Sequence, residues 1–236
     1  MINEQHSRTA LLLGEPALDK LANARVAVFG IGGVGGYVAE ALARAGVGAL
    51  DLIDSDTVSV SNLNRQIIAL HSTVGRLKVD VMAERIRDIN PDCLVRALPL
   101  FYLPEMAGEF DFSSYDYIAD AIDTVSAKLD LAVRAHEAGT PIIAAMGAGN
   151  KLDAAAFEVA DIAKTSVCPL ARVMRIELRK RGINHMKVVY SKEEPLTPTA
   201  TDPTSPQRRA PGSVSFVPGA AGLVMAGEII KDLVKE

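Results

Sequence analysis

The chain of 236 residues is 49% apolar and 23% charged, with a formal net charge of −4, which is typical of a folded globular protein. These values exclude an intrinsically disordered chain and a protein that coats nucleic acid through a large basic surface. Two cysteines are too few for a disulfide framework. The N-terminus lacks a signal-peptide pattern and no apolar run is long enough to span a membrane, so we expect a cytoplasmic protein with no membrane partner.

The first predicted elements form a strand–turn–helix unit. The apolar run 25–29 predicts a buried strand, the alanine-rich run 37–45 a helix, and 50–53 a second strand. The turn between the first strand and the helix is Gly30-Ile31-Gly32-Gly33-Val34-Gly35, in which missing side chains let backbone N–H groups approach a phosphate. Asp54 closes the second strand, where a carboxylate can hold ribose hydroxyls. The unit therefore predicts a nucleotide site.

The alternation of strands and helices continues along the chain. We predict a helix at 78–90, strands at 94–98 and 117–122, a helix at 126–138 and a strand at 142–145. Alternation of this kind joins parallel strands by crossover helices. It predicts an α/β fold with a doubly wound, mainly parallel Rossmann-like sheet and helices on both faces. At this length we expect a single domain over 1–236.

The alternation of strands and helices is less regular in the second half of the chain. Strands predicted at 157–160 and 187–191 flank a basic helix at 169–181 and extend or cover the sheet, and a closing helix is predicted at 217–235. The segment 195–212 is rich in Pro, Thr and Ser, which predicts a flexible loop.

Basic residues concentrate between residues 164 and 192. Eight of them stand there against one acid, although the whole chain is acidic. This region either binds a polyanion or forms a solvated helix face whose charge the rest of the surface balances.

The residues beyond Asp54 bear on which nucleotide is bound. An NAD-dependent dehydrogenase shares the glycine pattern but has no need of a guanidinium just past the second strand, whereas Arg65 offers a planar fork of donors to a triphosphate. Lys78 begins a predicted helix and supplies a second cation for the phosphates. Either cation could instead be an ordinary surface residue, so a non-enzymatic or NAD-binding Rossmann module remains an alternative.

Five motifs together carry a family resemblance. They are the glycine turn, Asp54-Ser55-Asp56, Ser61-Asn62-Leu63-Asn64-Arg65-Gln66, Val74-Gly75-Arg76-Leu77-Lys78 and Asp120-Ala121-Ile122-Asp123. Over roughly residues 8–150 they resemble the ubiquitin-activating-like adenylyltransferases of the ThiF/MoeB type. The resemblance implies an enzyme that uses ATP and Mg²⁺ to adenylate a carboxylate.

The same resemblance implies roles for individual residues. It places Asp54 on the ribose, Asn62 and Arg65 on the phosphates, Lys78 at the reacting phosphate and Asp123 on Mg²⁺. The other nucleotide-binding residues predicted on this basis are Gly30, Gly32, Gly33, Gly35, Asp56, Ser61, Asn64, Gln66 and Thr124.

Arg8 resembles the N-terminal arginine of this family, which reaches across a homodimer into the ATP site of the other subunit. We therefore expect a homodimer, with Arg8 joining Arg65, Lys78 and Asp123 as catalytic residues.

The chain also departs from the family pattern. Relatives that activate ubiquitin-like or sulfur-carrier proteins carry two zinc-binding C-x-x-C pairs, and this sequence has none. Some relatives use a cysteine nucleophile, and Cys168 is the candidate here, although its place before an apolar helix is typical of a buried, inert thiol. Cys93 lies in a predicted turn without an evident role.

A second block of sequence is similar to a zinc-free branch of the family, the tRNA threonylcarbamoyladenosine dehydratases. The block comprises 147–153, 159–165 and 169–172, and the resemblance extends over nearly the whole chain. It implies that the carboxylate of threonylcarbamoyladenosine at position 37 of tRNA is adenylated and then cyclised, with release of AMP. An intramolecular nucleophile would make an enzyme cysteine unnecessary.

The sequence also bears on possible binding partners of the protein, which are tRNA, a monovalent cation and a second protein. The predicted tRNA-binding residues are Arg172, Arg175 and Arg179, spaced along one helix face, together with Arg208 and Arg209. A monovalent cation, K⁺ or Na⁺, beside 147–149 and a cysteine-desulfurase or sulfur-acceptor partner are further possibilities. The alternative function is adenylation of the C-terminus of a ubiquitin-like or sulfur-carrier protein.

Overall fold

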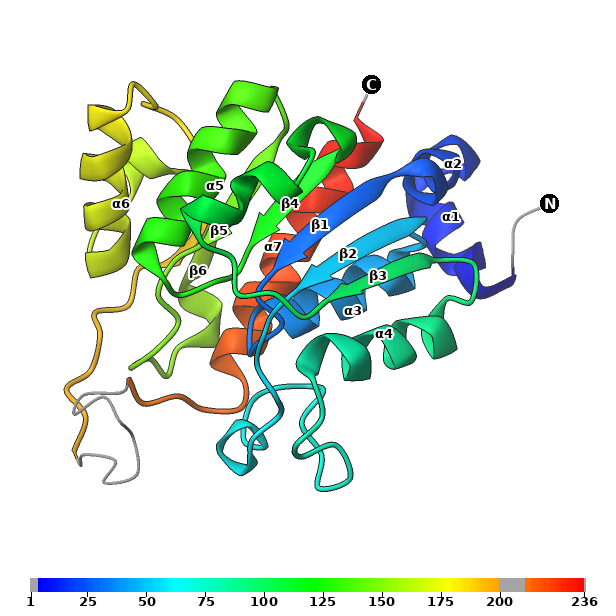
Figure 1. The fold of residues 1–236 in the computed structure, drawn as a ribbon, viewed down its shortest axis with the longest axis horizontal. Helices are drawn as coiled ribbons and strands as arrows, with labels where there is room; N and C mark the ends of the chain where they lie inside the picture. Colours follow the sequence, from blue (N-terminus) through cyan, green and yellow to red (C-terminus); the bar gives the residue numbers. More distant parts are fainter. Residues whose placement is uncertain (1–3, 200–210, 236) are drawn as a thin grey trace.

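A seven-stranded sheet forms the centre of the computed structural model, which describes residues 4–199 and 211–235 (Figure 1). The strand order is β3-β2-β1-β4-β5-β7-β6. The strands are β1 (Arg25–Phe29), β2 (Ala49–Ile53), β3 (Leu94–Leu98), β4 (Tyr117–Asp120), β5 (Ile142–Ala145), β6 (Phe157–Asp161) and β7 (Lys187–Ser191). Neighbouring strands run parallel, and the pair at the β6 edge is antiparallel. The predicted mainly parallel sheet is confirmed, and the two late strands extend it.

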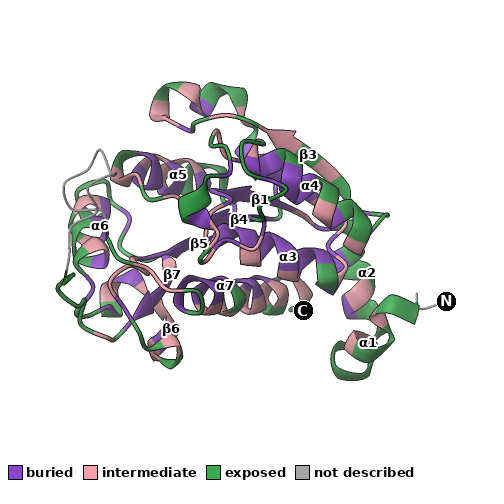
Figure 2. Cartoon of the chain, turned by 90° about the horizontal axis from the view of Figure 1, so that it is seen from below, coloured by how far each residue is buried: buried purple, intermediate pink, exposed green. Residues whose placement is uncertain are grey.

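Helices cover both faces of this sheet (Figures 1 and 2). On one face lie α3 (Gly35–Ala45), α4 (Lys78–Ile89) and α7 (Val217–Val234), and on the other α5 (Val125–Ala138) and α6 (Pro169–Lys180). Before the sheet come α1 (Ser7–Leu13) and α2 (Glu15–Asn23), which the sequence analysis did not predict. Short 3₁₀ turns are η1 (Glu4–His6), η2 (Val60–Asn62), η3 (Pro104–Glu109), η4 (Phe112–Ser114), η5 (Ala154–Ala156) and η6 (Ile162–Lys164). The doubly wound architecture is thus confirmed.

Burial follows the layers of the fold (Figure 2). The central strands β1 and β4 are buried almost throughout, as expected for parallel strands with helices on both sides. In contrast, α1 buries no residue, and the side chains of Leu11 and Leu12 are 86% and 88% exposed. None of the helices in the described residues is long and apolar enough to span a membrane.

Some helix and strand boundaries differ from the prediction, notably at the end of β4 and at the start of α3. The predicted strand 117–122 ends at Asp120, because the chain turns there and the Ile122 amide donates to Asp120 Oδ1 at 3.3 Å. The helix predicted from residue 37 begins at Gly35, the last glycine of the turn. Of the predicted loop 195–212, residues 195–199 and 211–212 have no regular structure, and 200–210, with Arg208 and Arg209, lie outside the described residues.

The register of the sheet brings three turns to one place. Phe29, the last residue of β1, pairs with Ile53 on β2 and with Asp120 on β4. The glycine turn, Asp54 and the residues after Asp120 therefore leave the sheet side by side. The order of strands reverses between β1 and β4, and in open α/β sheets ligands bind beyond the carboxyl ends of the strands at such a point.

Candidate active site

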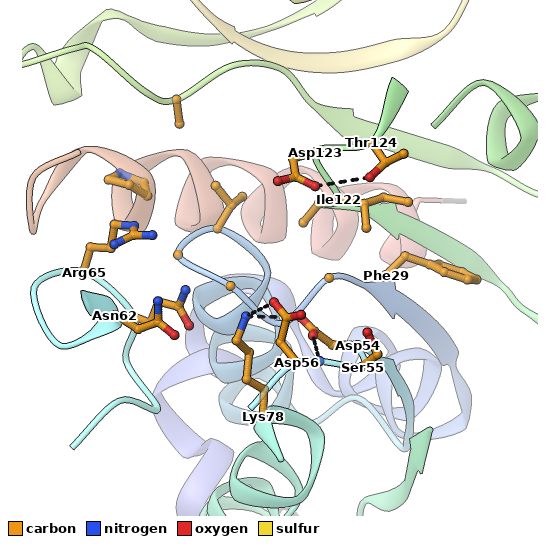
Figure 3. Close-up of a pocket in the computed structure, with 18 of the residues that line it drawn as sticks. Phe29, Asp54, Ser55, Asp56, Asn62, Arg65, Lys78, Ile122, Asp123 and Thr124 are labelled. Carbon is orange, nitrogen blue, oxygen red and sulfur yellow. Dashed lines mark hydrogen bonds and ion pairs between the residues drawn. The ribbon is translucent and has the colours of Figure 1, made fainter. Parts of the chain in front are cut away.

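A pocket of about 370 Å³ lies at this edge of the sheet. Phe29 is at one end, Arg65 and Asn62 are at the other, and Lys78 lies between them with the aspartates that follow β2 (Figure 3). Of the predicted nucleotide-binding residues, the following line the pocket: Gly30, Gly32, Gly33, Asp54, Asp56, Asn62, Arg65, Gln66, Lys78, Asp123 and Thr124. The fold therefore gathers motifs that are far apart in the sequence.

Two glycines of the turn are required by close backbone contacts. Gly30 has φ +88°, and a Cβ there would lie 2.7 Å from the carbonyl oxygen of Ala121. A Cβ on Gly35 would lie only 1.7 Å from the Gly30 oxygen. Gly35 thus allows α3 to pack against the turn, and it does not itself line the pocket.

Asp54 connects the glycine turn to the turn after β2. One carboxylate oxygen accepts from the Ile31 amide at 2.7 Å, and the other accepts from the Asp56 amide at 2.8 Å. Burial raises the pKa of Asp54, and nearby Lys78 opposes that rise. An oriented carboxylate at this position can accept hydrogen bonds from ribose hydroxyls.

Lys78 is a buried cation at the first residue of α4. Its Nζ donates to Asp56 Oδ2 at 2.6 Å and lies 3.9 Å from Asp54 Oδ2 (Figure 3). Its backbone amide also donates to the Asp56 carbonyl oxygen at 3.0 Å. Both ends of the lysine are therefore held by the turn after β2, with the ammonium in the pocket.

Arg65 is a half-buried guanidinium that lacks a carboxylate partner among the described residues. Its Nη1 donates to the Ser61 carbonyl oxygen and to Asn64 Oδ1, both at 2.9 Å. Burial lowers the pKa of Arg65 because water no longer fully solvates the charge. Such a group favours an anionic ligand, as a phosphate would be.

Ser61 and Asn64 do not line the pocket, although we predicted that both bind the nucleotide. The Ser61 hydroxyl lies 2.9 Å from the Ser59 hydroxyl, and the Asn64 amide nitrogen donates to the Ser213 carbonyl oxygen at 3.0 Å. Both residues instead accept hydrogen bonds from Arg65, so they hold a residue that does line the pocket.

Asp123 lies in the exposed turn after β4. Its carboxylate lies 3.5 Å from the Thr124 hydroxyl, which is a weak contact (Figure 3). The carboxylate oxygens are therefore available to a hard cation such as Mg²⁺. In the described residues no three acidic, histidine or cysteine side chains form a metal cluster.

A buried ion pair that the sequence analysis did not identify holds this same turn. Lys128 Nζ lies 2.9 Å from Asp120 Oδ2 and donates to the Ile122 carbonyl oxygen at 3.1 Å. Both side chains are fully buried. The spacing of an acid and a lysine on one segment was the available signal, but it is too common to identify such a pair.

The apolar end of the pocket was also missed. It is lined by Phe29, Leu100, Phe101, Tyr102 and Ile122. Flat apolar and aromatic surfaces of this kind suit a purine base, and the pair of aromatic residues shortly after β3 was the signal in the sequence.

The remaining predicted residues lie outside the pocket. Arg8 is exposed on α1 and does not line the pocket of its own chain. Arg172 and Arg179 are exposed on α6, but Arg175 is half-buried and donates to the Thr165 carbonyl oxygen at 2.9 Å and to its hydroxyl at 2.6 Å. Arg175 thus stabilises the turn before α6, and its predicted contact with tRNA stays a prediction.

Both cysteines are buried. Cys168 is the N-cap residue of α6, and Cys93 lies in the turn before β3. Burial raises the pKa of Cys93 to about 11, which leaves its thiol protonated.

Comparison with known proteins agrees with this geometry. The profile of the ThiF family matches residues 6–236. A Bacillus subtilis protein named tRNA threonylcarbamoyladenosine dehydratase is 44% identical over 98% of this chain and 95% of its own length. Solved structures of the Escherichia coli protein of that name, TcdA, in complex with AMP and with ATP, each superpose with a TM-score of 0.89 at 37% identity, covering 99% of this chain and 96% of theirs. The chain belongs to the ThiF family.

Proposed function

We propose that this protein is an ATP-dependent enzyme that dehydrates threonylcarbamoyladenosine at position 37 of tRNA. A carboxylate oxygen of the modified nucleoside attacks the α-phosphorus of ATP, and pyrophosphate leaves. A nitrogen of the same nucleoside then attacks the acyl carbon, loses its proton and expels AMP. The nucleoside has lost one water in total, and the second step needs no enzyme nucleophile because it is intramolecular.

The observation that carries this proposal is the convergence of Asp54, Arg65, Lys78 and Asp123 on one pocket beside the glycine turn. Positive charge at Arg65 and Lys78 matches the charge that builds up on the leaving pyrophosphate. The identity shared with the dehydratases over nearly the full chain supports this carboxylate as the substrate. The ATP and AMP bound to the E. coli relative correspond to the substrate and the released product of the proposed reaction.

Each residue has a proposed task. Asp54 binds the ribose, Phe29 and its apolar neighbours pack against the base, and Arg65 with Asn62 orients the phosphates. Lys78 stabilises charge at the reacting phosphate. Mg²⁺, held by Asp123 and the phosphates, would add Lewis-acid polarisation of the phosphoryl oxygens.

A homodimer is part of the proposal because α1 is otherwise unexplained. It exposes Leu11 and Leu12 and carries Arg8 away from the pocket of its own chain. A second copy that covers the leucines would bury this apolar surface, and its own Arg8 could then reach the phosphates. We assign Arg8 its catalytic task on this basis.

The tRNA is proposed to contact the exposed face of α6. Arg172 and Arg179 are exposed on this face. The neighbouring Lys180 and Arg181 both form ion pairs with Glu177, so the proposal rests on the two arginines. Phosphate contacts from such arginines position a nucleic acid without reading its sequence. A tRNA substrate supports a cytoplasmic location, which is part of the proposal.

The test is incubation of the protein with ATP, Mg²⁺ and tRNA carrying threonylcarbamoyladenosine, followed by mass analysis of the nucleoside. We expect loss of one water and release of one AMP per nucleoside. The Lys78→Ala variant serves as the inactive control. If the mass is unchanged, and AMP forms from ATP only when a small protein with a flexible C-terminal tail is added, then the substrate assignment is wrong.

A further inference from the structure

A chain of hydrogen bonds, joined at one point by the peptide bond between Gly212 and Ser213, runs from Arg65 to the loop after β5. Arg65 Nη1 donates to Asn64 Oδ1 at 2.9 Å, and Asn64 Nδ2 donates to the Ser213 carbonyl oxygen at 3.0 Å. The next residue back, Gly212, exchanges two bonds with Asn150: its amide donates to Asn150 Oδ1 at 2.6 Å, and its carbonyl accepts from the Asn150 amide at 2.7 Å. Three segments of the chain are thereby linked to the Arg65 guanidinium.

The backbone conformation and the hydrogen-bonding groups of Asn150 allow it to join these segments. Its φ is +59°, a left-handed conformation that asparagine adopts more readily than most residues with a side chain. Its carbonyl oxygen also accepts from the Leu196 amide at 2.7 Å. One residue thus anchors residues 196 and 212 at the same point.

The anchored residues form a wall of the nucleotide pocket. Gly149, Pro211, Gly212 and Ser213 all line it. Contact between the two sides of this wall is close, because a Cβ on Gly149 would lie 2.7 Å from Pro211 Cβ. A change at Asn150 would therefore be transmitted to Ser213 and, through it, to Asn64.

We propose that Asn64 and Asn150 are positioning residues that orient the Arg65 guanidinium for the phosphates beyond the α-phosphate of ATP. An arginine side chain has many rotamers, and ordering it before the ligand binds removes an entropic cost from binding. The proposal rests on the proposed function, in which Arg65 binds the ATP phosphates.

The location of Arg65 makes the proposal selective between nucleotides. Arg65 lies at the end of the pocket opposite Phe29, so a nucleotide with its base at Phe29 presents its distal phosphates to the guanidinium (Figure 3). AMP has no such phosphates. Loss of the positioning bonds should therefore weaken ATP binding and leave AMP binding unchanged, a pattern that general damage to the fold would not produce.

The experiment measures dissociation constants of ATP and of AMP by calorimetry on the full chain, in Mg²⁺ buffer without tRNA. We expect Arg65→Ala to raise the ATP constant about tenfold, since a charge-assisted bond is lost, and to change the AMP constant less than about twofold. Asn64→Ala and Asn150→Gly should each raise the ATP dissociation constant about threefold to fivefold, because each variant loses an Oδ1 acceptor of the chain. Glycine is chosen at position 150 because it keeps the left-handed backbone conformation.

Two control variants separate positioning from stability. Asn150→Asp keeps an acceptor for the Gly212 amide and tolerates the left-handed conformation, so it should restore most of the ATP affinity. Asn23→Ala removes a comparable side-chain bond, 2.8 Å to the Asp19 carbonyl oxygen, outside the pocket, and should leave both constants unchanged.

The outcomes distinguish this inference from the function on which it rests. If Arg65→Ala leaves the ratio of ATP to AMP affinity unchanged, the phosphate-binding role of Arg65 is wrong. If Arg65→Ala changes the ratio while Asn64→Ala and Asn150→Gly do not, the positioning role is overturned and the proposed function stands. Equal weakening of ATP and AMP, together with a lower melting temperature, would also overturn it.

Discussion

The buried pair formed by Asp120 and Lys128 offers the sharpest test of how the structure holds its site. Lys128→Met keeps most of the apolar stem but removes the ammonium, which lies 2.9 Å from Asp120 Oδ2 and 3.1 Å from the Ile122 carbonyl oxygen. Since both side chains are fully buried, the carboxylate is left without a counter-charge. Breaking such a pair costs about 3–5 kcal/mol, and we expect a loss of this size in the free energy of unfolding at pH 7.

The pH dependence of that loss has a definite sign. Burial raises the pKa of Asp120 in the folded protein, and removing Lys128 raises it further. A carboxyl whose folded pKa is raised contributes stability below its unfolded pKa and loses it as pH increases. The penalty of Lys128→Met should therefore be small near pH 4, where Asp120 can take up a proton, and should grow toward neutral pH.

Urea unfolding of the wild type, Lys128→Met and the double variant Asp120→Asn with Lys128→Met, measured between pH 4 and pH 8, checks this reasoning. The double variant should recover part of the stability because its amide carries no charge to desolvate. A loss below about 1 kcal/mol at pH 7, or a loss that does not change with pH, would show that the pair is not the buried charge couple described here.

Three further outcomes are expected. Lys78→Met should lower the turnover of the tRNA reaction by about 100-fold or more, because a cation that stabilises developing phosphate charge is removed. Gly35→Ala should destabilise the fold by about 1–3 kcal/mol in urea unfolding because its Cβ would lie 1.7 Å from a backbone oxygen, whereas Gly227→Ala, with no atom within 4 Å, should be neutral or stabilising. Burial alone would raise the pKa of Asp232, but hydrogen bonds from Lys187, Lys235 and Tyr117 together lower it to about 2. The carboxylate therefore contributes stability above pH 4 that is lost as pH falls toward 2, so Asp232→Asn should flatten the acid limb of a stability curve.

The sequence alone identified the parts of the site that lie within single turns. The glycine turn, Asp54, Lys78 and Asp123 each directly follow or begin a predicted element, and Arg65 lies in the segment after the second strand. Alternation of strands and helices implies that the carboxyl ends of the strands meet. Such positions are readable because local spacing and residue type suffice to find them.

The sequence did not predict which arginines of the basic helix are exposed and which are hydrogen-bonded. Arg172, Arg175 and Arg179 share one helical face in the sequence, but only the folded chain brings the Thr165 carbonyl oxygen and hydroxyl to Arg175. The helix α1 was missed because it buries no residue and so has no amphipathic pattern.

The tertiary structure alone decided which residues stand behind the nucleotide-binding groups. Asn64 meets Ser213 across 149 positions of sequence, and Gly212 meets Asn150 across 62. Their partners are backbone carbonyl and amide groups, which every residue possesses, so no residue pattern marks them. The sequence determined the chemistry of the pocket through side-chain type and local order, whereas the orientation of that chemistry depends on long-range backbone contacts that exist only once the chain has folded.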